Sequence, residues 1–146
     1  MNVQYAQRQY VNTQIKTADR LKLVVMLYEG AISFLRQAKT KMENNDIAGR
    51  GVFIGKAQDI ILELDNSLNL ELGGEIASNL RKLYGFMNRY LTKTIVKWDP
   101  QAIERVIHML SQLKEAWEEI SLRPQAEIPI AQKRPAGNSV IARQVF

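Results

Sequence analysis

The sequence of 146 residues contains no cysteine and only one histidine. The lack of cysteine excludes disulfides, thiolate chemistry and sulfur-ligated metal sites, and it favours a reducing compartment. No stretch reaches the ~18 unbroken apolar residues that a membrane span needs, and the N-terminus shows no basic stretch followed by an apolar run. We therefore expect a cytoplasmic protein without a membrane span or a signal peptide.

Neither the single histidine nor the paired glycines form a recognisable catalytic or ligand-binding motif. His108 follows Glu104 by four residues. A di-iron carboxylate site in a helical bundle needs a Glu-x-x-His pair on each of two helices, which one histidine cannot supply. Gly73 and Gly74 follow no strand and lack a Lys-Ser/Thr pair, so a phosphate-binding loop is not indicated. We expect no catalytic residue, metal or cofactor, a boundary His108 with an exposed edge, and a tight turn at the glycines.

Proline is scarce before Ile120 and frequent after it. Three of the four prolines fall in residues 121–146, which show no helical periodicity, so we expect a flexible tail there. Residues 1–18 are polar and rich in Gln and Asn, which predicts an N-terminal docking arm, and residues 19–120 remain as one domain. The alternative for the tail is that it folds over a groove through its apolar residues, which are Ile128, Ile130, Val140, Ile141, Val145 and Phe146.

The formal charge of +5 comes from the two ends of the chain. Residues 19–120 carry 14 basic and 14 acidic side chains, whereas residues 121–146 carry four basic and one acidic. The neutral body lacks the basic surface of a DNA-binding domain, so we predict no nucleic-acid partner. The alternative is a basic tail that binds nucleic acid or an anionic surface, which a steep salt dependence would reveal. Its residues would be Arg123, Lys133, Arg134 and Arg143.

Four segments repeat apolar residues at steps of three and four, which is typical of amphipathic helices. Helices of this length joined by short turns become antiparallel neighbours, and no strand pattern competes. We therefore predict an all-α fold, an antiparallel up-and-down four-helix bundle with the docking arm and flexible tail at its ends. The predicted helices are residues 19–44, 46–69, 75–96 and 99–120.

Two start signals and one apolar stripe per helix support these segments. Asp19 can act as an N-cap, and Asp99-Pro100 places a capping residue before a proline at the first helical position. The stripes are Leu21, Val24, Tyr28, Leu35 and Met42; then Phe53, Ala57, Ile60, Leu64 and Leu68; then Ile76, Leu80, Leu83, Met87 and Leu91; and last Ile103, Ile107, Leu110, Leu113, Trp117 and Ile120.

Two of these helices carry more apolar surface than one core-facing stripe requires. The surplus indicates either a wide core face or a surface on which a partner helix or the chain's own arm packs. Periodicity alone leaves both readings open. The surplus residues are Leu23, Leu27, Ala31 and Phe34 in the first helix and Tyr84, Phe86 and Tyr90 in the third.

Several stretches resemble a known family, the flagellar secretion chaperones called FliS. They occur in the order and spacing of that family and cover roughly residues 10 to 120. The stretches are YVNTQIKTA at 10–18, LVVMLYEGA at 23–31, KAQDII at 56–61, GGEIA at 73–77 followed by Asn79-Leu80 and Leu83-Tyr84, and EAWEEI at 115–120. Two departures are the Asp19-Arg20 pair where the family commonly has Ser-Pro, and the long tail.

The resemblance implies a chaperone rather than an enzyme. Its partner would be the disordered C-terminal segment of flagellin, which becomes helical against apolar grooves and is passed to the flagellar export apparatus. A segment that folds on binding gives up ordering entropy, so its affinity must come from long apolar contacts. The oligomeric state stays open, and a homodimer could cover the grooves when cargo is absent.

The resemblance also suggests which residues bind the partner. Tyr10 and Ile15 would form a removable plug that packs on the bundle without cargo. The second and third helices would form the main docking surface, with Gln58 and Asn79 fixing the register of the cargo helix. The apolar candidates on that surface are Ile60, Ile61, Leu64, Leu80, Leu83, Tyr84 and Met87, and some of them must also belong to the core.

Overall fold

The computed structural model describes residues 3–122, with side chains from Asp19 onward, and this part of the chain is helical throughout apart from short turns. The predicted all-α fold is confirmed, and residues 123–146 lie outside the described part. The helices are α1 (Val3–Glu43), α2 (Ile47–Asn66), α3 (Leu70–Val96) and α4 (Pro100–Leu122).

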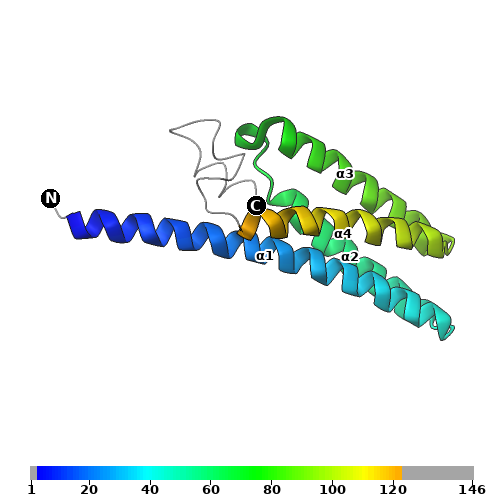
Figure 1. The fold of residues 1–146 in the computed structure, drawn as a ribbon. Coiled ribbons are helices and arrows are strands. Elements are labelled where there is room, and N and C mark those ends of the chain that lie inside the picture. Colours follow the sequence, from blue (N-terminus) through cyan, green and yellow to red (C-terminus); the bar gives the residue numbers. More distant parts are fainter. Residues whose placement is uncertain (1–2, 123–146) are drawn as a thin grey trace.

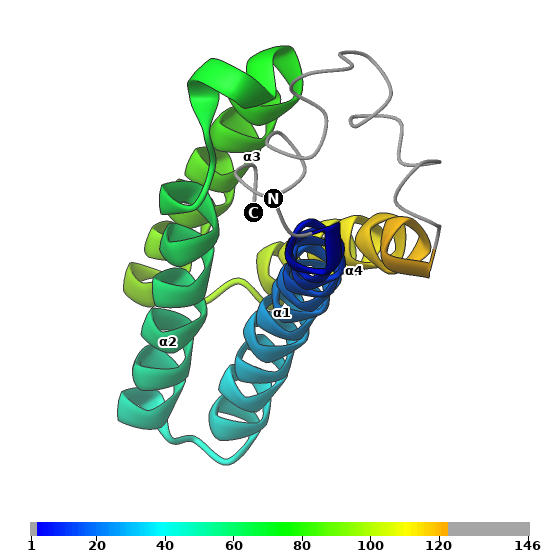
Figure 2. The ribbon, with the colours of Figure 1, turned by 90° about the vertical axis from the view of Figure 1, so that its left-hand side faces the viewer.

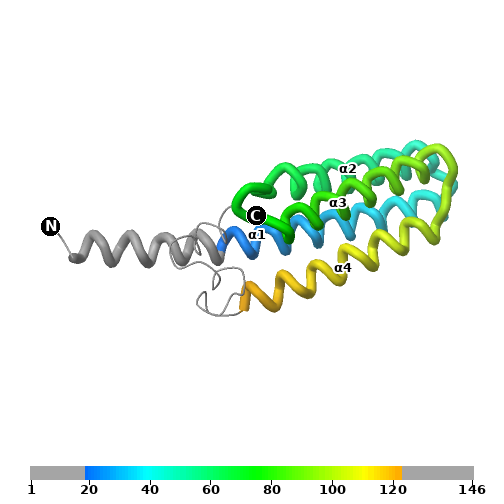
Figure 3. The backbone as a smooth tube through the Cα atoms, turned by 90° about the horizontal axis from the view of Figure 1, so that it is seen from above, coloured from blue at the N-terminus to red at the C-terminus, as the bar shows by residue number. Residues whose placement is uncertain are grey.

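The four helices form an up-and-down bundle (Figure 1). The turns span residues 44–46, 67–69 and 97–99, so each helix runs back along the previous one. Helix α1 packs against α2 and α4, and α3 packs against the same two helices from the other side. The contact between α1 and α2 is the most extensive of these four pairs and that between α3 and α4 the least extensive, and the tube in Figure 3 shows the four helices running lengthwise beside one another.

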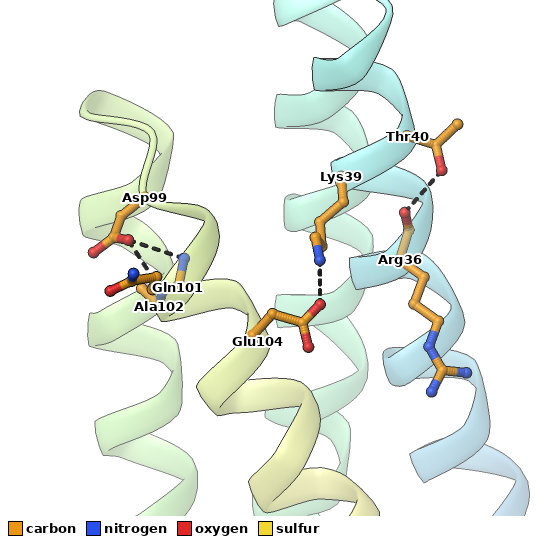
Figure 4. A network of polar contacts seen from close by, with 7 residues as sticks. All are labelled: Arg36, Lys39, Thr40, Asp99, Gln101, Ala102 and Glu104. Atoms are coloured by element: carbon orange, nitrogen blue, oxygen red, sulfur yellow. Dashed lines mark hydrogen bonds and ion pairs between the residues drawn. The ribbon is translucent and has the colours of Figure 1, made fainter.

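Side-chain caps define three of the helix starts. The Asp46 Oδ1 atom accepts a hydrogen bond from the Gly49 amide at 2.8 Å, and Asn69 Oδ1 accepts one from Leu72 at 2.9 Å. At α4, Asp99 Oδ1 accepts from the Gln101 amide at 3.0 Å and also from the next amide (Figure 4). These bonds satisfy amides that have no partner within the helix. The predicted start at Asp99-Pro100 is confirmed.

The first helix begins at Val3, so the predicted start at Asp19 is wrong. Residues 3–18 contain neither glycine nor proline, and nothing in them forces a helix to end. An N-cap residue favours a helix start only where the preceding chain leaves the helix, and here the helical backbone continues through Asp19. The docking of residues 1–18 on the bundle stays a prediction.

The paired glycines lie inside α3, so the predicted turn at this point is also misplaced. The turn between α2 and α3 is formed by residues 67–69, and the backbone is already helical at Leu70. Gly74 then interrupts α3 with φ 56° and ψ −133°, which produces a kink. Only glycine adopts such a conformation without strain. The long part of α3 therefore begins after Gly74, as the periodicity predicts.

The core contains most of the predicted stripe residues. Ile76 is the exception, because 43% of its surface is exposed. Met42, Phe53, Ile60, Leu68, Leu83, Leu113 and Ile120 are partly buried. The fully packed stripe residues are Leu21, Val24, Tyr28, Leu35, Ala57, Leu64, Leu80, Met87, Leu91, Ile103, Ile107, Leu110 and Trp117.

A buried guanidinium fastens the turn end of the bundle. Arg50 on α2 donates hydrogen bonds to the Met42 Sδ atom and to the Ile95 carbonyl, both at 3.2 Å. Its guanidinium carbon also lies 5.2 Å from the centre of the Trp98 ring, at cation–π distance. Arg50 thereby joins α1, the end of α3 and the α3–α4 turn at one point.

Candidate partner-binding groove

Helices α3 and α4 meet at the turn 97–99 and diverge toward the start of α3 (Figures 1 and 2). The two helices are joined near the turn by the Arg105 Nη1 atom, which donates to the Tyr90 hydroxyl at 2.6 Å. Their limited contact leaves one face of each helix without a close neighbour. A cleft opens between the two helices beside Tyr90. We use the name α3–α4 groove for this cleft together with the helix faces that extend from it, with its narrow end at Tyr90 and its mouth at Ile76 and Ile120.

The α3 side of the groove is an apolar stripe with helical spacing. Ile76, Asn79, Leu83, Phe86 and Tyr90 follow one another at steps of three and four, so they share one face of the helix. Phe86 is 45% exposed, and its ring stacks on Tyr90 with centroids 5.3 Å apart. Ile76 is also exposed, Leu83 and Tyr90 are partly exposed, and Asn79 is the one polar member of the stripe. Apolar side chains that share one exposed face indicate a binding surface more strongly than scattered ones do.

The α4 side continues the same kind of lining. Met109 faces Phe86 and Tyr90 across a shallow cleft of about 630 Å³, which Glu104, Arg105 and His108 also line. Further residues extend the Met109 face toward the mouth at steps of four, three and four, and they are Leu113, Ala116 and Ile120. Apolar lining with a few polar groups at the rim is the usual composition of a peptide-binding groove.

The polar rim of the cleft is held by neighbouring helices. The Lys39 ammonium on α1 donates to the Glu104 carboxylate across the α1–α4 contact, as the dashed line in Figure 4 shows. Arg105 points the other way, to Tyr90 on α3. His108 is exposed, as expected from the sequence. Among residues 19–122 no three acidic or histidine side chains converge in a way that could hold a metal ion.

The floor beside the groove contains a buried polar cluster. Trp117 Nε1 donates to the Tyr28 hydroxyl at 3.1 Å, and the Tyr28 and Tyr84 hydroxyls share a short hydrogen bond. Burial raises the pKa of both tyrosines above its ordinary value, since the charged phenolate is disfavoured away from water. Both hydroxyls therefore stay neutral at physiological pH and join α1, α3 and α4 as hydrogen-bonding groups.

Five of the residues predicted to bind the partner lie in the core instead. A bound partner cannot touch these side chains unless the bundle opens, because each is at most 9% exposed. Their stripe positions face the bundle axis, where all four helices meet. These residues are Ile61, Leu64, Leu80, Tyr84 and Met87.

Two further candidates serve contacts between helices. The Gln58 amide donates to the Asn88 carbonyl at 3.1 Å and to the Thr92 hydroxyl at 2.9 Å, which ties α2 to α3. Ile60 is half-buried against α1, and a β-carbon at Gly30 would stand 3.2 Å from its Cδ1 atom. The close approach of α1 and α2 explains why the expected docking surface on α2 is largely filled by the protein itself.

Asn79 and Leu83 are the predicted residues that the structure places on the α3–α4 groove. Asn79 is exposed near the mouth, and Leu83 is half-buried between Asn79 and Phe86. Tyr10 and Ile15 fall within α1, but their side chains lie outside the described part. The role of all these residues in binding stays a prediction.

The structure adds groove residues that the predicted site omits. Phe86 and Tyr90 had a sequence signal, because they stand outside the core stripe of their helix. Met109 and Arg105 had none, since a methionine and an arginine on an amphipathic helix are ordinary at the edge of a core. The surplus residues of the first helix divide differently: Ala31 is buried, Leu27 and Phe34 are half-buried, and Leu23 is exposed.

These features define a class of protein: a helical bundle with an open apolar groove and no assembled catalytic cluster among the described side chains. No described helix has the length and apolar content to span a membrane. The model of the family described as flagellar protein FliS matches residues 1–124 of this chain.

Relatives of known name agree with the family match. The flagellar secretion chaperone FliS of Vibrio cholerae is 42% identical over 110 residues, which cover 75% of this chain and 81% of the relative. The protein of the same name from Salmonella typhimurium is 41% identical over 112 residues, covering 76% and 83%. The one from Bacillus subtilis is 29% identical over 119 residues, covering 82% and 88%.

The chain belongs to the FliS family of flagellar proteins. The resemblance noted in the sequence is thereby confirmed. The relatives are named as chaperones, which supports a role in flagellar export and agrees with the expectation that the protein is not an enzyme.

Proposed function

We propose that this protein is a cytoplasmic export chaperone that binds the C-terminal segment of flagellin in the α3–α4 groove. The chaperone keeps the segment from polymerising and delivers its cargo to the flagellar export apparatus. The observation that carries the choice of groove is the pair of mainly apolar stripes on α3 and α4, which face each other across the least extensive of the four contacts between neighbouring helices.

The spacing of the stripes suits a helical ligand. Side chains at steps of three and four on two adjacent helices provide holes into which the residues of a third helix can pack. A cargo segment that is disordered when free would become helical against these stripes. The aromatic pair Phe86 and Tyr90 supplies large, rigid contact surface, and such residues commonly dominate binding energy.

Release of the cargo also follows from this arrangement. A segment that orders on binding gives up conformational entropy, so its net affinity is lower than the buried area alone indicates. Apolar contacts without deep burial of charge allow the segment to be handed on to the export apparatus. The groove therefore combines protection of the cargo with reversible binding.

The experiment is isothermal titration calorimetry of the full chain with a peptide of the flagellin C-terminal segment, at low and at high salt. Phe86→Ala is the groove variant, and Leu62→Ala is its control, because Leu62 is similarly exposed but lies on α2. We expect 1:1 binding with a negative heat-capacity change and little salt dependence. Phe86→Ala should weaken binding about tenfold or more, and Leu62→Ala should leave the affinity unchanged.

Three results would count against the proposal. Absence of binding by a well-folded protein would remove flagellin as the cargo. Equal affinity of the wild type and Phe86→Ala would move the cargo to another surface. Binding that falls steeply with salt would favour charge contacts, such as those of the basic tail, over the apolar groove, since salt screens the attraction between exposed charges.

A further inference from the structure

Helix α4 ends beside the mouth of the groove. Ile120 is the last groove residue of α4, and the helix ends two residues later at Leu122. Pro124 cannot donate a helical hydrogen bond and disfavours the helical conformation at the residue before it. The sequence therefore favours an end of the helical conformation close to the groove.

We propose that the segment Ile128-Pro129-Ile130 of the same chain docks in the cleft formed by Phe86, Tyr90 and Met109. The docked tail covers apolar surface while no cargo is bound. Its competition with cargo rests on the proposed function, whereas the docking itself does not.

The tail is long enough for this contact. Leu122, where the helix ends, and Met109 are thirteen residues apart on α4, which corresponds to about 20 Å along the helix. Ile128 and Ile130 follow Leu122 by six and eight residues, and extended chains of these lengths reach up to about 21 Å and about 28 Å. The segment can therefore turn at Pro124 and run back along the groove to the cleft.

The local sequence of the tail suits an apolar cleft. Pro129 has a fixed φ and favours an extended conformation at Ile128. In an extended chain, side chains two residues apart point to the same side, so Ile128 and Ile130 can enter the cleft together. Proline also loses less conformational freedom on docking than other residues do.

Charge complementarity also favours docking of the tail along the groove. The end of the bundle where the groove opens carries acidic side chains on both helices, Glu71 and Glu75 at the start of α3 and Glu115 and Glu119 near the end of α4. The tail carries four basic residues and one acidic residue. Attraction between the two raises the local concentration of the tail at the mouth.

The family match places the docking segment outside the shared part of the protein. The match ends at residue 124, four residues before Ile128.

The absence of cysteine allows a direct test on the full chain. A spin label on Gln132→Cys would be the only label in the molecule, and its effect on amide signals can be read by NMR. We expect broadening at Phe86, Tyr90 and Met109, and its loss when the docking segment carries I128S and I130S. A mixture of spin-labelled protein without ¹⁵N and unlabelled ¹⁵N protein should show no such broadening.

Each other outcome overturns the proposal. No broadening in the parent protein, or broadening that persists in I128S/I130S, would remove the segment from the cleft. Broadening in the mixture would assign the cleft to a second copy of the chain.

Titration with the flagellin peptide separates the two proposals. The I128S/I130S variant should bind the peptide about threefold or more tightly than the parent, because the competent fraction rises. Equal affinities would refute competition. If the groove signals broaden but neither protein binds the peptide, the docking stands and the proposed function fails.

Discussion

The bundle has two halves, the helix pair α1–α2 and the helix pair α3–α4, and they differ in how completely side chains fill the space between the two helices. Between α1 and α2, Phe34 packs on Phe53 with ring centroids 6.0 Å apart, and Gly30 lets Ile60 approach the backbone. Between α3 and α4, Phe86 and Ile76 remain exposed, and a cleft separates Phe86 from Met109. Apolar side chains therefore form a closed interface between α1 and α2, whereas between α3 and α4 they leave a groove.

The difference depends on where the bulky side chains lie relative to the bundle axis. Tyr84 reaches the centre, where its hydroxyl meets Tyr28, whereas Phe86, two positions later, points to the outer side of α3. A helix cannot bury both faces against only two neighbours. The open half can therefore bind a partner without loss of the core.

Tyr84→Ala should have the largest effect of the changes considered. Tyr84 on α3 bonds to Tyr28 on α1, so its loss should destabilise both halves of the bundle. The substitution removes a buried ring and leaves the Tyr28 hydroxyl without one partner, so we expect a loss of about 3–5 kcal/mol in unfolding free energy. Urea denaturation followed by circular dichroism measures it. Tyr84→Phe, which keeps the ring, should lose about 1–2 kcal/mol. Similar losses for the two variants would show that the ring contributes little.

Alanine substitutions of one phenylalanine in each half, Phe34 and Phe86, compare the stability of the two halves directly. Phe34→Ala should destabilise the closed half by about 2 kcal/mol, less than a fully buried ring because Phe34 is half-buried. Phe86→Ala should change stability by less than about 1 kcal/mol, because its ring is already exposed. Thermal unfolding of both variants tests this. A larger loss for Phe86→Ala would mean that the groove face belongs to the core.

Gly74→Ala tests whether the mouth of the groove depends on the kink in α3. Gly74 has φ 56°, and an alanine there should lose about 1–2 kcal/mol in strain or force a straighter α3. Gly73→Ala is the control, because no positive φ is found at Gly73 in the described chain. Chemical denaturation of both gives the strain. Equal stability of the two variants would contradict a structural need for glycine at position 74.

Alkaline pH tests the buried tyrosine pair that joins the halves. Tyrosine titrates near pH 10 in the unfolded chain, and burial raises its pKa in the folded protein. The folded state therefore binds more protons above pH 10, and stability must fall as pH rises, by about 1.4 kcal/mol per pH unit for each tyrosine. Denaturation at pH 9 to 11 should show a shallower decline for Tyr28→Phe. Parallel curves would place the Tyr28 hydroxyl in contact with water.

The helices could largely be predicted from the sequence, because apolar periodicity and caps are local signals. The stripe through Ile103, Ile107 and Leu110 and the start at Asp99-Pro100 are of this kind. The start of α1 was missed because a plausible cap at Asp19 outweighed the lack of any helix-breaking residue before it. The two local signals, a capping residue and a stretch without helix breakers, predict different starts, and in the structure the helix continues through Asp19.

The groove could be predicted only in part. Tyr84 and Phe86 both lie outside the predicted stripe of the third helix, yet Tyr84 is buried and Phe86 is exposed. Which side of α3 its neighbours cover depends on the packing of all four helices and on the turn at residues 97–99, which no periodicity within one helix encodes. Core and groove residues were therefore mixed in the predicted site.

The Arg50 contact makes the width of the groove depend on the angle between α3 and α4 at the turn. Arg50 contacts the Ile95 carbonyl at the end of α3 and the Trp98 ring in the turn, whereas α3 and α4 contact each other little. Over the roughly 30 Å of helix from this pivot to Ile76, a rotation of about 5° moves the tip by nearly 3 Å. A slight adjustment at the pivot thus changes the width available to a ligand by about the radius of a side chain.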